Sequence, residues 1–179
     1  MRDLNKKNIK LLSMSAISLA LSVLFLIMFR GPISILSTFI IPPIIVLFSL
    51  NNDLRYYVLT SLGLIIISSI FFPTQIVFVT LYILLAFFIR FLFFNNKNEL
   101  KIKVPSVITY IILVMISLYL GIRITQIIFL VPLHTMMLRL SGGNPINYIG
   151  ILIIEAIITV SVNIIFLRVF FSRIDTYKR

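Results

Sequence analysis

Two charged side chains lie inside long apolar stretches of this 179-residue chain and are its first candidates for chemistry. Arg123 stands within the apolar region from Val104 to Leu138, and Glu155 is the only acid inside an apolar run. A charge in hydrocarbon costs at least about 2.5–3.5 kcal/mol unless it is paired or hydrated. Arg123 is therefore expected to contact an anionic group of a ligand, to reach the membrane surface, or to pair with Glu155. Glu155 in turn predicts a ligand contact, a proton site or a structural ion pair.

Polar residues follow Arg123 at helical spacing. Gln126 comes one turn later and His134 three turns later, so a continuous helix would place all three on one face. His134 is the only histidine, and Met136 and Met137 stand beside it. Histidine and methionine ligate many haems, but an interfacial histidine with lipid-facing methionines is the favoured interpretation.

The last apolar run has its own polar stripe. Thr159 and Asn163 follow Glu155 at steps of four residues, so the three share one helix face.

A mostly apolar pocket with a few convergent polar groups is the usual form of a small-molecule site. We therefore expect a ligand cavity in the outer half of the membrane, between the fifth and sixth helices and under the first and last outer loops. The residues predicted to line it are Arg123, Gln126, His134, Asn144, Asn147 and Glu155, with Asn163 deeper.

The residues needed for several kinds of catalysis are missing. The chain has no cysteine, which excludes disulfides, zinc–thiolate sites and thiol catalysis. It has no zinc-binding His-Glu-x-x-His sequence, no Gly-x-Ser-x-Gly nucleophile turn and no phosphate-binding Walker loop. We therefore expect no catalytic residues, no metal site, no cofactor and no enzymatic activity.

The composition indicates the environment in which these residues lie. Hydrophobic residues make up 60% of the chain and charged residues only 12%, against roughly a quarter in soluble domains, and the mean hydropathy is +1.15. The net charge of +11 comes from basic residues at the ends of the apolar runs. That placement favours a lipid bilayer with anionic headgroups as the partner, rather than nucleic acid.

About 20 apolar residues are needed for each helix that crosses a membrane. The apolar runs predict an all-α, six-helix membrane bundle in one transmembrane domain covering residues 1–179. Proline at 132 should kink the fifth helix. The predicted spans are Leu11–Phe29, Ile33–Leu50, Tyr56–Phe72, Ile76–Phe94, Val104–Leu138 and Ile146–Phe171.

Basic residues stand before the first span and in every second connector, a bias that marks the cytoplasmic side. With six spans, the bias places both termini in the cytoplasm and predicts a multi-pass protein of the cell membrane. The basic groups are Arg2, Lys6, Lys7 and Lys10; Arg55; Arg90, Lys97, Lys101 and Lys103; and Arg168, Arg173, Lys178 and Arg179.

The first span contains a pair of small residues, Ala16 and Ala20, four positions apart on one helix face. Small residues at this spacing allow another helix to approach closely within a membrane. The partner could be a separate subunit or another helix of the same bundle, and the spacing alone is compatible with both.

Taken together, these features resemble the substrate-binding S components of energy-coupling-factor (ECF) vitamin transporters. In that family a small-residue docking motif stands where Ala16 and Ala20 stand here. The stretch "FLVPLHTMMLRLSGGNPINYIGILIIEAIITVSVN" is similar to the family's fifth-to-sixth helix segment, with His134 in place of the usual aromatic residue and with Glu155 and Asn163 at its polar positions. The second-span sequence "FIIPPIIVLF" is also similar.

The resemblance implies a binding protein of the bacterial plasma membrane. It would capture a vitamin-like micronutrient, with flavin and haem among the candidates, and dock on a membrane coupling subunit powered by two cytoplasmic ATPases. The main alternative is a structural membrane protein of a cell-shape complex, resembling the MreD family and binding no small molecule. A proton-coupled carrier using Glu155 is a third, less favoured interpretation.

Overall fold

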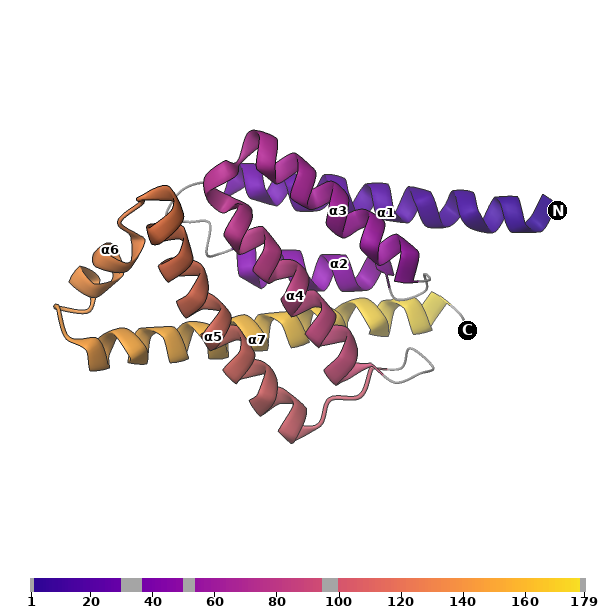
Figure 1. Cartoon of the computed structure of the whole chain (residues 1–179). Helices are drawn as coiled ribbons and strands as arrows, with labels where there is room; N and C mark the ends of the chain where they lie inside the picture. Colours follow the sequence, from indigo (N-terminus) through magenta and orange to yellow (C-terminus); the bar gives the residue numbers. More distant parts are fainter. Residues whose placement is uncertain (1, 30–36, 50–53, 95–99, 178–179) are drawn as a thin grey trace.

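The computed structural model describes residues 2–29, 37–49, 54–94 and 100–177, and it is all-α (Figure 1). No strand occurs within those ranges, where a single antiparallel bridge joins Phe94 and Leu100. The elements are α1 (Arg2–Met28), α2 (Ile41–Ser49), α3 (Leu54–Phe71), the 3-10 turn η2 (Pro73–Gln75), α4 (Ile76–Phe93), α5 (Val104–Phe129), α6 (Leu133–Leu140) and α7 (Pro145–Tyr177).

Three stretches are long and apolar enough to cross a membrane: Pro73–Phe93, Val104–Phe129 and Pro145–Phe171. Shorter apolar helical stretches cover Leu12–Met28, Ser37–Leu47 and Arg55–Phe71. Large apolar side chains are also exposed on the outside of the bundle, among them Phe91 and Ile127, which are about three-quarters exposed. Exposed apolar surface on this scale is typical of a protein surrounded by lipid.

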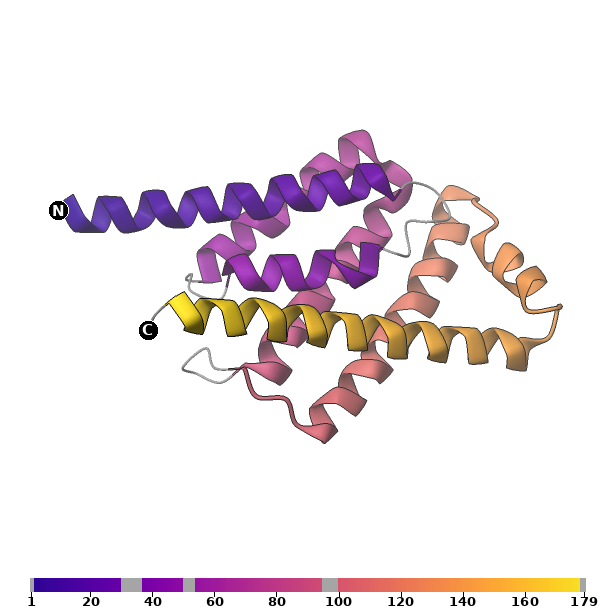
Figure 2. The ribbon, with the colours of Figure 1, turned by 180° about the vertical axis from the view of Figure 1, so that it is seen from behind.

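The helices pack as a chain of neighbours. Helix α1 packs on α2 and α3, α2 packs on α4, and α5 lies between α4 and α7. The beginning of α1 and the end of α7 lie at the same end of the molecule in both views (Figures 1 and 2). The α6 helix lies at the opposite end, next to the beginning of α7.

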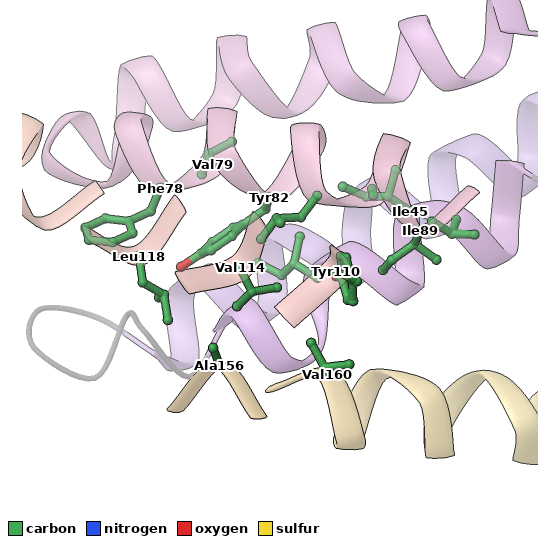
Figure 3. Packing of buried hydrophobic residues seen from close by; sticks show 14 of the residues in the cluster. Ile45, Phe78, Val79, Tyr82, Ile89, Tyr110, Val114, Leu118, Ala156 and Val160 are labelled. Atoms are coloured by element: carbon green, nitrogen blue, oxygen red, sulfur yellow. The ribbon is translucent and has the colours of Figure 1, made fainter. Parts of the chain in front are cut away.

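The core lies where α4 and α5 meet α2 and α7 (Figure 3). Tyr82 and Tyr110 are almost completely buried within it, and Ala156 and Val160 of α7 close it on one side. Gly121 allows α5 to approach α4 closely, because a Cβ atom there would lie 2.8 Å from Cε1 of Phe78. This close packing fixes the position of α5 and therefore that of Arg123, half a turn further along.

The region predicted as one kinked helix from Val104 to Leu138 consists of two helices. Helix α5 ends at Phe129, and Leu130 adopts a left-handed conformation with φ of 56°. The helix therefore stops before Pro132, in keeping with the restriction that a proline places on the residue preceding it. The polypeptide then resumes as α6, which turns back toward α7.

The predicted second span, Ile33–Leu50, is helical only in part. A 3-10 turn covers residues 37–39, and α2 begins at Ile41, so Pro42 and Pro43 lie in its first turn. Proline is well tolerated there, since the first amides of a helix have no intrahelical acceptor. The two prolines thus mark the start of a helix within the predicted second span. Residues 33–36 and 50 lie outside the described ranges.

Candidate ligand site at helices α5, α6 and α7

Helix α6 is attached to α5 through Gln126. The side-chain oxygen of Gln126 accepts a hydrogen bond from the backbone N–H of His134, with an N···O distance of 3.0 Å. Amides at the start of a helix have no partner within it, so Gln126 acts as a cap supplied by the neighbouring helix. The two predicted site residues Gln126 and His134 are therefore brought together, although they do not share one continuous helix.

His134 also joins α6 to α7. Its imidazole ring meets the ring of Tyr148 edge-on, with centroids 5.1 Å apart and planes at 80°, a favoured geometry for ring pairs. Burial, and then the positive charge of the nearby Arg123, lower the pKa of His134 below its ordinary value. This direction favours the neutral imidazole, and the buried Nδ1 atom of the ring has no hydrogen-bond partner in the described part of the chain.

Arg123 is exposed and lies against Tyr119, one turn earlier on α5. Its guanidinium carbon is 5.6 Å from the centre of the Tyr119 ring, and its Nε–H donates to the Tyr119 hydroxyl at 3.3 Å. The guanidinium is also close enough to Tyr148 and His134 to interact with both electrostatically. Arg123 is thus the charged member of a group that contains residues of α5, α6 and α7.

Glu155 lies half-buried on α7. It interacts electrostatically with Tyr82 and Tyr148, and no ion pair joins it to Arg123 within the residues that the structure describes. Thr159 and Asn163, which follow it along the same face, are fully buried. The predicted stripe therefore faces the bundle, with the carboxyl group at the edge of the candidate site.

Asn163 belongs to the core. Its side-chain N–H donates to the hydroxyl of Tyr110 at 3.5 Å, and both side chains are fully buried. Thr159 lies between it and Glu155 and donates to the Glu155 backbone carbonyl at 2.8 Å. Asn163 therefore lies two helical turns beyond Glu155 and about four turns beyond Tyr148, the α7 member of the group around Arg123.

Asn144 and Asn147 hold the turn between α6 and α7. The side-chain oxygen of Asn144 accepts from the backbone N–H of Ile146 at 2.9 Å, the arrangement of a helix cap. Asn147 donates through its amide to the carbonyl of Ser141 at 3.3 Å. Both predicted site residues thus orient the start of α7, and both remain exposed.

Tyr119 and Tyr148 are the two members of this group that sequence reasoning missed. Tyr119 precedes Arg123 by four residues and Tyr148 precedes Glu155 by seven, so each shares a helix face with a charged residue. This spacing is the signal in the sequence that could have identified the two tyrosines. Aromatic residues make up 13% of the chain, so a tyrosine on the same helix face as a charged residue does not stand out.

A second set of buried polar groups lies beside the core. Ser37 and Thr38 are fully buried and lie near the hydroxyl of Tyr82. Gln75 is also buried, and its amide donates to the backbone carbonyl of Phe29 at 3.3 Å. These residues connect the end of α1, the beginning of α2 and the start of α4.

Ala16 and Ala20 are both exposed on α1. The inward face of the same helix is formed by Ser15, Ser18, Ser22 and Leu26, which are buried. The small-residue pair therefore lies on the surface of the bundle as the structure describes it.

The group around Arg123 is suited to binding. It combines an exposed cation, a neutral imidazole and two phenol rings, which together can hold a flat molecule with an anionic substituent. No group of three or more potential metal ligands occurs in the ranges that the structure describes.

Comparison with protein-family models, curated proteins and solved structures found no match for this chain.

Proposed function

We propose that this chain is the substrate-binding subunit, or S component, of an ECF-type importer, and that it captures a vitamin-like or other micronutrient without catalysing a reaction. The observation that supports this best is the position of Arg123. Its guanidinium is exposed, lies against Tyr119 and is close to His134 and Tyr148. An exposed cation among aromatic rings suits a flat ligand with a carboxylate or phosphate, and flavin and haem are candidates.

The proposed topology has six membrane crossings: α1, the stretch containing α2, α3, α4, α5 and α7. Helix α6 then lies at the outer surface. Two observations support it: the beginning of α1 and the end of α7 lie at one end of the molecule (Figure 2), and basic residues stand at both of these helix ends. Cysteines introduced at Leu140 and at Lys101 should then be labelled from opposite sides of intact cells, with Leu140 accessible from outside. Labelling of both from outside contradicts this topology.

The proposed docking surface is the face of α1 that contains Ala16 and Ala20, and the partner is the coupling subunit with its two ATPases. Support comes from the exposure of both alanines on an apolar helix. Replacing both by Trp should abolish co-purification of the coupling subunit while ligand binding survives. Leu59→Trp, at an exposed position of α3, is the matched control and should leave docking intact.

The central experiment is to purify the chain from its native host and identify any co-purifying small molecule by absorbance and mass spectrometry. Arg123→Gln should weaken binding of that molecule by about 1.5–3 kcal/mol, the range for hydrogen bonds to charged groups. Arg168→Gln is the control, because Arg168 is exposed on α7 far along the helix from Tyr148. Recovery of protein partners without any small molecule would contradict the proposal and favour a structural protein of the cell-shape type.

A further inference from the structure

A small cavity lies where α4 ends and α5 begins. Figure 1 shows that this junction is well separated from α6. Its volume is about 250 Å³. That is slightly below the ~300–1,000 Å³ typical of sites for drug-sized ligands, so it suits a small polar group better than a whole micronutrient. Its lining consists of Leu92, Phe93, Phe94, Lys101, Lys103 and Ser106.

The lining of the cavity has an apolar side and a polar side. Leu92, Phe93 and Phe94 belong to the end of an apolar helix, whereas Lys101, Lys103 and Ser106 supply ammonium and hydroxyl donors. A lipid at the membrane boundary has the same division, with an apolar glycerol and acyl region beside an anionic phosphate. The cavity therefore matches a lipid headgroup in polarity.

The two lysines are held in place by the backbone. The N–H of Lys101 donates to the carbonyl of Phe93 at 2.7 Å, and the neighbouring residues Phe94 and Leu100 form an antiparallel bridge. Lys103 is the residue immediately before α5, and its carbonyl accepts from the N–H of Val107 at 3.1 Å. This backbone pairing holds both lysines beside the end of α4, where they line the cavity.

We infer that this cavity binds the phosphodiester of an anionic phospholipid in the adjacent leaflet, with Lys101, Lys103 and Ser106 as its polar contacts. The apolar side of the cavity, through the partly exposed Leu92 and Phe94, contacts the glycerol and the first methylenes of the acyl chains. A lipid bound between α4 and α5 would brace the junction between these two helices. This inference concerns the junction of α4 and α5 rather than the group around Arg123, and it is independent of the micronutrient site.

The test is a lipid titration of the whole purified chain in detergent, followed by native mass spectrometry. Phosphatidylglycerol should bind more tightly than phosphatidylcholine with the same acyl chains. Lys101→Gln and Lys103→Gln should each weaken phosphatidylglycerol binding by about fivefold, the factor expected for one basic residue near an anionic surface. Arg55→Gln and Arg168→Gln remove exposed charges that do not line the cavity, and they should leave binding unchanged.

A second pair of variants tests the cavity without changing charge. Ser106→Phe should fill it and weaken phosphatidylglycerol binding, whereas Thr109→Phe, at an exposed position one turn along α5, should not. Equal binding of the two lipids, or equal losses in the Arg55 and Lys103 variants, would overturn the inference in favour of diffuse surface charge. Displacement of the lipid by inorganic phosphate at millimolar concentration would overturn it in favour of a site for free anions.

Discussion

The imidazole of His134 packs edge-on against the phenol of Tyr148, with ring centroids 5.1 Å apart. This contact joins a helix of only eight residues, α6, to the buried side of α7. So short a helix is not stable alone in water, and its position depends on such contacts. Tyr148 is therefore expected to have two separable roles, one through its ring and the other through its hydroxyl.

Tyr148→Phe keeps the ring and removes a buried hydroxyl that has no hydrogen-bond partner among the described residues. The melting temperature should therefore be no lower than that of the parent protein, because an unpaired buried hydroxyl is itself destabilising. Ligand affinity should fall by about 0.5–1.5 kcal/mol, the net value of one hydrogen bond, if the hydroxyl contacts the ligand beside Arg123. Tyr148→Ala should lower both quantities, since it also removes a ring pair worth about 0.5–1.5 kcal/mol. Equal destabilisation by the two variants would contradict separate roles.

Gln126→Leu should release the start of α6. It removes the acceptor for the His134 amide and leaves an unpaired N–H, at a cost of about 1–3 kcal/mol if that amide stays buried. Hydrogen exchange should accelerate by roughly tenfold or more at the first amides of α6, with little change in the middle of α7. Gln126→Glu retains an acceptor oxygen and is the matched control. Unchanged exchange in Gln126→Leu would show that α6 is held by its other contacts alone.

The all-α class and the apolar helices could be predicted because their signal is local: long apolar runs bounded by charge. The sequence predicted that Gln126 and His134 lie close together, but for a reason that differs from what the structure shows. A continuous helix would have aligned them, whereas in the structure α5 ends at Phe129 and α6 folds back. The sequence pattern was therefore informative about proximity, although not about the path of the backbone.

Contacts between distant helices could not be derived in the same way. Nothing in the sequence indicates which of the seven tyrosines lies beside His134, because that depends on how α7 crosses α5. Asn144 and Asn147 were predicted as ligand contacts because they are polar and near the outer end, and in the structure both also hold the turn before α7. Polar residues at a helix start serve as caps so often that position alone does not separate the two roles.

Leu130→Gly should stabilise the protein. Leu130 is in the left-handed region, which costs a residue with a Cβ atom roughly 1–2 kcal/mol, and its side chain is 85% exposed. After allowance for the greater freedom of glycine in the unfolded chain, we expect a gain of about 0.5–1 kcal/mol. Leu140→Gly is the control: Leu140 is similarly exposed but ends a helix with ordinary dihedrals, so the same change should destabilise. Thermal unfolding in detergent measures both, and the same sign for both would contradict the role of φ at Leu130.

Two glycines that both lie inside helices should respond to alanine in opposite ways. At Gly121 an added Cβ would lie 2.8 Å from Cε1 of Phe78 and 2.9 Å from Cδ1 of Leu81. These distances require α4 and α5 to separate or their side chains to shift, so Gly121→Ala should cost about 1–3 kcal/mol. At Gly150 nothing lies within 4 Å of the added atom, and Gly150→Ala should gain about 0.5–1 kcal/mol from helix propensity.

Denaturation in detergent at increasing dodecyl sulfate concentration would compare the two glycine variants with the parent protein. Arg123 lies two residues after Gly121 on α5. A separation of α4 and α5 should therefore also displace the guanidinium from the other site residues. Gly121→Ala is accordingly expected to weaken ligand binding together with stability, while Gly150→Ala leaves binding unchanged. A Gly121→Ala protein as stable as the parent would mean that the two helices tolerate a wider spacing, and that Arg123 is positioned by Tyr119 and α6 instead.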